Sequence, residues 1–176
     1  MEVLDYKQMA SLINSVTDRI TKELYIANRF GTLEEVLKKY DLEEEKEIAS
    51  SYYLPNSKIL IIGAVNSNKN DIYKTFKNVG ISSDRIEIFE DFDKLTGFDV
   101  EKLRYNTRYS DILVCAVPHK MKNIGDYPDI ISMIEHNQEE FPLLNKITNE
   151  SGELRFSISG LRKAIGKTKI FKDTLG

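Results

Sequence analysis

The chain has 176 residues, of which 41% are hydrophobic and 30% are charged. Both fractions are typical of globular proteins and argue against a disordered chain. The net charge of −3 at pH 7 supplies no general positive field for nucleic acid, which is therefore not expected as a partner. The single cysteine, Cys115, excludes an intramolecular disulfide and a cysteine-based metal cluster.

The first residues, MEVLDYKQMASL, give no sign of export, because they contain an early acidic residue and no apolar signal segment. The longest apolar runs, 59–62 and 112–117, are too short to span a bilayer. With one unpaired cysteine as well, the sequence predicts a cytoplasmic protein that does not enter a membrane.

Residues 1–56 are predicted to form a helical N-terminal region. Apolar side chains recur there at steps of three and four, the stripe of an amphipathic helix: Met9, Leu12, Ile13, Val16, Ile20, Leu24 and Ala27. Gly31 is expected to end this helix in the left-handed conformation. Thr32 and Glu35 match a capping box that would begin a second helix.

This pair of helices is too small to bury both of its apolar faces on itself. The long stripe must therefore cover either the rest of the chain or a second copy. The acidic run Glu43–Glu47 favours a second copy, because a solvated spacer would hold the helices apart from the remaining residues. We expect self-association through the N-terminal helices, giving a homodimer.

Residues 57–176 are predicted to alternate strands with helices. Strands are expected at 58–64, 85–89, 111–117, 141–144 and 154–156. Helices are expected at 71–79, at 126–136 and after a serine cap at Ser157 or Ser159, with short helical pieces between 92 and 105. Gly80 fits the end of the helix at 71–79 as a Schellman cap, with Ile81 returning to Phe76.

The apolar runs 59–62 and 112–117 predict strands buried on both faces, whereas the alternation in 85–89 predicts an edge strand. Strands that alternate with helices form parallel sheets with right-handed crossovers. The expected fold is a small Rossmann-like three-layer α/β domain with a parallel sheet of about five strands. The first three strands are expected in the order 2-1-3, with later strands beside the third.

Ligands of such sheets bind beyond the carboxyl ends of the strands. The first loop there reads Gly63-Ala64-Val65-Asn66-Ser67-Asn68 and lacks both G-x-G-x-x-G and G-K-[ST]. A standard NAD or ATP site is therefore not expected, and we predict no cofactor. Helix capping by this segment and Asp71 is the simpler interpretation, and an anion on the free N–H groups is the alternative.

His119 is the candidate catalytic residue, because it follows the third strand and a proline and has Lys120 beside it. Such a histidine can exchange a proton near neutral pH, and the lysine can hold an anion; the alternative is a loop histidine with no task. The loops after strands one and three should bring Asn66, Ser67, His119 and Lys120 together around a small anionic ligand. Two distant histidines and scattered acids predict no metal site.

The stretch from Arg104 to Tyr109 interleaves two arginines with two tyrosines. Such a mixture can stack on nucleic-acid bases, although it is equally typical of a surface loop.

Three segments, ILIIG, LRYNTRYSDILV and PHKMKNIGDY, together resemble an uncharacterised group of small bacterial proteins with a Rossmann-like domain of unknown function. The likeness covers about residues 58–165, and its distinctive elements are P-H-K at 118–120 and G-D-Y at 125–127. It implies the fold and no activity. It draws attention to His119, Lys120 and Asp126. With the first loop, the candidate ligand-binding set is Asn66, Ser67, Asn68, His119, Lys120 and Asp126.

The preferred interpretation is a cytoplasmic binding or interaction module with an anion or small-ligand cleft at the carboxyl ends of its strands. One alternative is a small hydrolase or transferase acting on a phosphate-bearing substrate, with His119 as acid or base. Another is a nucleic-acid-associated protein that uses residues 104–109.

Overall fold

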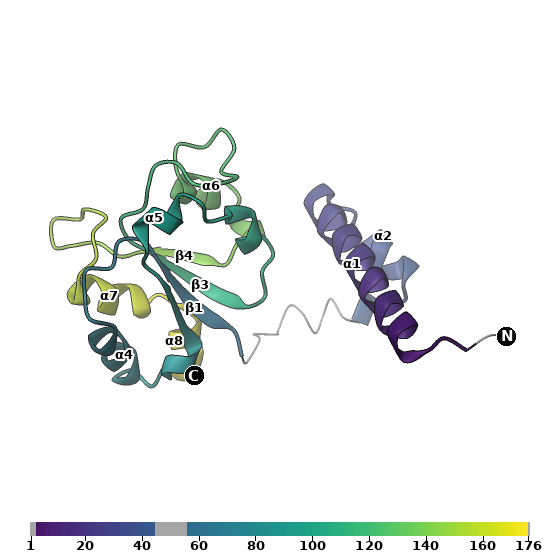
Figure 1. The fold of residues 1–176 in the computed structure, drawn as a ribbon, viewed down its shortest axis with the longest axis horizontal. Coiled ribbons are helices and arrows are strands. Elements are labelled where there is room, and N and C mark those ends of the chain that lie inside the picture. Colours follow the sequence, from purple (N-terminus) through teal and green to yellow (C-terminus); the bar gives the residue numbers. More distant parts are fainter. Residues whose placement is uncertain (1–2, 45–55, 176) are drawn as a thin grey trace. The chain divides into compact units, whose positions relative to one another are not determined.

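The computed structural model describes residues 3–44 and 56–175 (Figure 1). The chain divides into two compact units, Met1–Tyr53 and Leu54–Gly176, and we describe each by itself. Residues 45–47 of the predicted acidic spacer lie outside the described residues.

The first unit is a helical hairpin made of α1 (Tyr6–Phe30) and α2 (Leu33–Lys39). Asp5 and Gln8 begin α1 with a reciprocal capping box, in which the Gln8 N–H donates to Asp5 Oδ1 at 2.8 Å. Gly31 ends α1 with φ 72°. The Thr32 N–H donates to the Ala27 carbonyl at 2.9 Å, so the predicted glycine terminus is confirmed and has the bonds of a Schellman motif.

The capping box predicted at Thr32 is wrong. Thr32 precedes α2 with φ −105° and ψ 19°, and its side chain makes no capping hydrogen bond. Its N–H is already used to close the end of α1, and its backbone is not in the extended conformation from which a cap hydroxyl reaches the next turn. The backbone of Thr32 still serves both helices, since its carbonyl accepts the Val36 N–H of α2 at 3.4 Å, but its side chain takes no part.

The second unit contains a four-stranded parallel sheet of β1 (Lys58–Ile62), β2 (Ile86–Phe89), β3 (Tyr109–Val114) and β4 (Leu143–Lys146). Its order, β2-β1-β3-β4, confirms the predicted 2-1-3 arrangement, the edge position of β2 and the place of the next strand beside β3. The fifth strand predicted at 154–156 is wrong, because Leu154 makes only an isolated bridge with Thr148. A short polar turn, residues 149–152, separates those two residues, so the segment folds back on the chain instead of joining the sheet.

The helices of this unit are α4 (Lys69–Lys77), α5 (Phe92–Leu95), α6 (Ile130–His136), α7 (Ile158–Ile165) and α8 (Lys169–Leu175). Short 3-10 helices lie at Ser83–Arg85, Val100–Leu103 and Gln138–Glu140. The predicted start of α6 at residue 126 is wrong, since Asp129 follows Pro128 and caps the helix by accepting the Ser132 N–H at 2.8 Å. Of the two serines predicted as alternative caps, Ser157 caps α7 by accepting the Gly160 N–H at 3.0 Å.

Helices cover both faces of the sheet (Figure 1), so the unit has three layers. Successive side chains of a strand point to opposite faces. Leu60, Ile62, Ile112 and Val114 face one buried cluster with residues of α5, α6 and the 100–103 helix. Ile59, Ile61 and Leu113 alternate with them and are fully buried, as are Phe76 of α4 and Leu161 of α7.

A buried carboxylate fixes the last helix, which the sequence did not predict. Asp111 lies within β3 with no exposed surface. Its Oδ1 accepts the Lys169 N–H at 2.9 Å at the start of α8, and its Oδ2 accepts the Ser110 hydroxyl at 2.7 Å. Burial raises the pKa of the Asp111 carboxyl, and these hydrogen bonds oppose that rise. A strand side chain thus caps a helix about sixty residues later in the chain.

Candidate functional site

The loops after β1 and β3 leave the same edge of the sheet and are joined at their base. The Ala64 N–H donates to the Ala116 carbonyl at 2.7 Å. Gly63 has φ 128°, and a Cβ built on it would lie 2.7 Å from both Ala116 O and Cys115 Sγ. Only glycine, which has no Cβ, allows the two backbones to come this close. The two loops are therefore packed tightly against each other where they leave the sheet.

The loop after β1 caps a helix. Asn68 is the N-cap of α4 and its side chain accepts the Asn70 N–H at 2.9 Å, which supports the capping interpretation of this segment. The next residue, Lys69, forms an ion pair with Glu90 at 2.8 Å, and this hydrogen bond raises the pKa of Lys69. Asn66 is exposed and Ser67 half-buried.

The loop after β3 carries exposed His119 and Lys120, followed by exposed Asp126. His119 acts electrostatically on Asp129, although the backbone N–H of Ser132 is the main cause that lowers the pKa of the Asp129 carboxyl. Within residues 3–44 and 56–175, no hydrogen bond or ion pair joins His119 or Lys120 to the 66–68 loop. The β1–β3 pairing therefore brings the two loops to one edge, while their candidate side chains make no contact that would orient the histidine for catalysis.

Cys115 follows β3 directly and is fully buried. Burial raises the pKa of its thiol to about 12. A thiol so protonated is a poor nucleophile, so Cys115 acts as an apolar core residue.

The arginines of the 104–109 stretch are bound to carboxylates of the same chain. Arg104 is bidentate to Glu101, at 2.9 and 3.1 Å, and forms an ion pair with buried Glu140. Arg108 bonds Glu87 at 2.6 Å. These pairs neutralise the charge that a phosphate backbone would need, so the geometry does not favour nucleic-acid binding.

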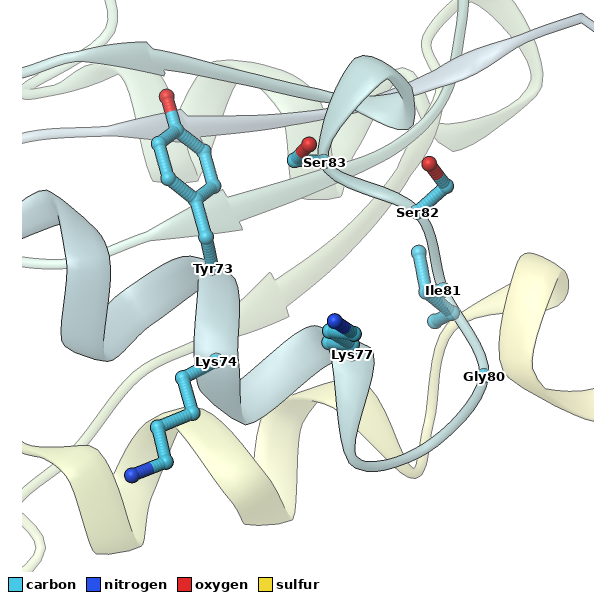
Figure 2. Close-up of a pocket in the computed structure, with 7 residues that line it drawn as sticks. All are labelled: Tyr73, Lys74, Lys77, Gly80, Ile81, Ser82 and Ser83. Atoms are coloured by element: carbon cyan, nitrogen blue, oxygen red, sulfur yellow. The ribbon is translucent and has the colours of Figure 1, made fainter.

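A pocket of about 640 Å³ is lined by none of the predicted site residues (Figure 2). Tyr73, Lys74 and Lys77 of α4 line it together with residues 80–83 of the following turn. The helix α4 returns from the carboxyl end of β1 to the amino end of β2. The pocket at the end of α4 therefore lies toward the amino ends of the strands, opposite the predicted site. In the sequence, this pocket is indicated only by two lysines, at 74 and 77, and by the serine pair at 82–83. Neither pattern predicts a binding site until the turn brings them together.

In Figure 2, Lys77 lies between Tyr73 and the turn, whereas Lys74 points away from the turn. Tyr73 and Ser83 face the same space from α4 and from the start of the 3-10 helix. Ile81 is buried at the base of the turn. The pocket thus combines cationic, hydroxyl and apolar groups, the composition of many small-ligand sites.

Comparison of the chain with protein-family models, with curated proteins and with solved structures gives no match. Among the described residues, no helix is both long enough and apolar enough to cross a membrane. The functional conclusion therefore comes from the geometry of the two units.

Proposed function

We propose that this chain is a self-associating binding module, in which α1 pairs with α1 of a second copy and the α/β unit binds a small ligand. The exposed apolar surface of α1 carries this proposal. Ten large hydrophobic side chains of the described residues are exposed, and nine of them lie between residues 3 and 30. Apolar surface gathered in this way marks an interaction site in a folded protein.

One face of α1 is covered at its C-terminal end and open at its N-terminal end. Ala27 is 3% exposed, whereas Val16 and Ile13, on the same helical face, are 45% and 56% exposed. The cover is α2, which the Glu23–Lys39 ion pair at 2.5 Å helps to hold. At 1.5 Å per residue α2 is about 10 Å long and α1 about 37 Å, so most of the stripe has no cover within the hairpin.

A second copy of α1 suits the open part of this face. Met9, Ile13, Val16 and Ile20 follow the alternating steps of four and three that form a coiled-coil seam. No charged residue occurs from Gln8 to Thr17, so two copies can meet there without like-charge repulsion. A two-fold pair places the same patch on both sides, and this uncharged, regularly spaced face is complementary to itself.

The architecture of the α/β unit supports the ligand-binding half of the proposal. The order β2-β1-β3-β4 matches the first four strands of the doubly wound order 2-1-3-4-5, which supports a Rossmann-like assignment. Ligands in that arrangement bind where the strand order switches, here beyond β1 and β3. The free, buried Cys115 fits a reducing compartment such as the cytoplasm.

Sedimentation velocity of the full chain at tens of micromolar tests the self-association. We expect a dimer that Ile13→Asp dissociates, with the dissociation constant raised at least about a hundredfold, because each protomer would bury an unpaired carboxylate in the interface. The matched control is Ser11→Asp, which places the same charge on the opposite face of α1.

A monomeric wild-type protein with intact helices would overturn the proposal. Equal weakening by Ile13→Asp and Ser11→Asp would also overturn it, because the effect would then not depend on the stripe. If the stripe instead covers the α/β unit, the wild type will be monomeric and Ile13→Asp will lower the stability of that unit.

A further inference from the structure

The turn that follows α4 leaves the ammonium groups of Lys74 and Lys77, near the end of that helix, free to bind a ligand. The Gly80 N–H donates to the Lys77 carbonyl at 3.0 Å and the Ile81 N–H to the Phe76 carbonyl at 3.1 Å, the two bonds of the predicted Schellman cap. Gly80 has φ 81°. Because backbone donors satisfy the last carbonyls of α4, the ammonium groups of Lys74 and Lys77 are not needed to bind them.

Within the described part of the chain, neither Lys74 nor Lys77 has a carboxylate partner. Asp84 follows the pocket residue Ser83 in the chain and accepts the Ser82 hydroxyl. That hydroxyl lowers the pKa of the Asp84 carboxyl most, followed by the backbone and by the charges of Arg85 and Lys58. Two lysines, Lys74 and Lys77, line the pocket and its lining contains no acidic residue, so the pocket carries positive charge on a protein whose net charge is −3.

Neutral donors and an apolar base complete the pocket. The hydroxyls of Tyr73 and Ser83 have no hydrogen-bond partner among the described residues. The Tyr73 ring is half-buried and can contact an apolar group, whereas Ile81 is only 2% exposed and offers little surface to a ligand. A volume of about 640 Å³ lies within the range of small-molecule sites.

We infer that this pocket binds a small organic phosphate, with Lys77 and Ser83 holding the phosphate, Lys74 at the rim, and Tyr73 contacting the apolar part of the ligand. Ammonium-to-phosphate hydrogen bonds are charge-assisted and therefore stronger than neutral ones. The inference identifies a site distinct from the carboxyl edge of the sheet, and it does not depend on pairing of α1.

Isothermal titration of the full chain with phenyl phosphate, inorganic phosphate and phenol tests the site. Phenyl phosphate should bind more tightly than inorganic phosphate, and phenol should not bind measurably. Lys77→Gln should weaken phenyl phosphate binding about tenfold or more, because it removes a charge-assisted hydrogen bond. Lys77 is exposed, so the substitution should leave the fold intact, which circular dichroism checks.

Lys120→Gln is the matched control, since it removes one exposed lysine from the carboxyl edge. Binding that survives Lys120→Gln and weakens in Lys77→Gln supports the inference. Binding lost in Lys120→Gln alone would place the anion at the carboxyl edge and overturn it, as would no phenyl phosphate binding at millimolar concentration. Co-sedimentation with phosphatidylcholine vesicles, with and without phosphatidic acid, separates a lipid headgroup from a free phosphate ester; retention that requires phosphatidic acid and Lys77 would identify the lipid source.

Discussion

The two units of the molecule differ in how far they bury their apolar residues. In the α/β unit, the apolar runs of β1 and β3 are buried between two helical layers, and Leu143 is its single exposed large hydrophobic residue among those described. In the helical hairpin, Ala27 and Leu37 are the buried apolar residues of the described segment 3–44, while nine large ones are exposed.

Regular apolar spacing in a sequence therefore does not by itself show that the side chains are buried. Both units have regular apolar periodicity, but a sheet presents two faces to several helices, whereas a long helix beside a short one covers little of its surface. The α/β unit buries its apolar runs within itself, whereas the described helices of the first unit leave most of the α1 stripe exposed.

The largest expected effect comes from core truncation. Ile61→Ala should lower the free energy of unfolding of the α/β unit by about 2–5 kcal/mol at every protein concentration, because it leaves a cavity at a fully buried position. Ile13→Ala should change that free energy by less than about 0.5 kcal/mol. Hydrogen exchange of the β1 and β3 amides measures both. A comparable loss in Ile13→Ala would mean that α1 covers the α/β unit.

A pair of glycines with positive φ gives the next effect. Gly63→Ala should destabilise its unit by about 3 kcal/mol, because strain at φ 128° adds to contact with Ala116 O and Cys115 Sγ. Gly31→Ala should cost only about 1 kcal/mol, since a Cβ there meets nothing within 4 Å. Chemical unfolding of each variant checks this. Equal losses would show that backbone strain alone decides both positions.

The smallest effect compares two carboxylates that cap helices, Asp111 in the core and exposed Asp5. Burial raises the pKa of Asp111 above its ordinary value of 3.8. The unfolded state therefore loses its proton first as pH rises, and the stability of the folded state falls until pH passes the raised value. Asp111→Asn removes this titration, so its stability relative to wild type should increase as pH rises from about 4.

Urea unfolding at several pH values between 4 and 7 measures this difference. Asp5→Asn serves as the control at neutral pH and should change stability by only a few tenths of a kcal/mol, because asparagine and aspartate cap helices about equally well. A difference between Asp111→Asn and wild type that stays constant with pH would contradict the assigned effect of burial.

Local signals were reliable where one segment determines its own structure. Gly31 and Gly80 both end helices as predicted, because an αL residue is required there whatever surrounds it. Thr32 shows the limit of such signals. Its sequence context matches a capping box, but the chain uses its N–H to close the preceding helix, and that competition depends on the length of the connection.

The sequence by itself determined the parallel sheet, the 2-1-3 strand order and the amphipathic character of α1, since these follow from periodicity and from the alternation of strands with helices. Only the tertiary structure decided that residues 154–156 stay outside the sheet and that Asp111 caps α8. It also brought Lys77 of α4 and Ser83 of the next turn to one pocket, away from the predicted carboxyl edge. Those features depend on contacts between residues whose local patterns are unremarkable, and burial and donor geometry exist only once the layers have packed.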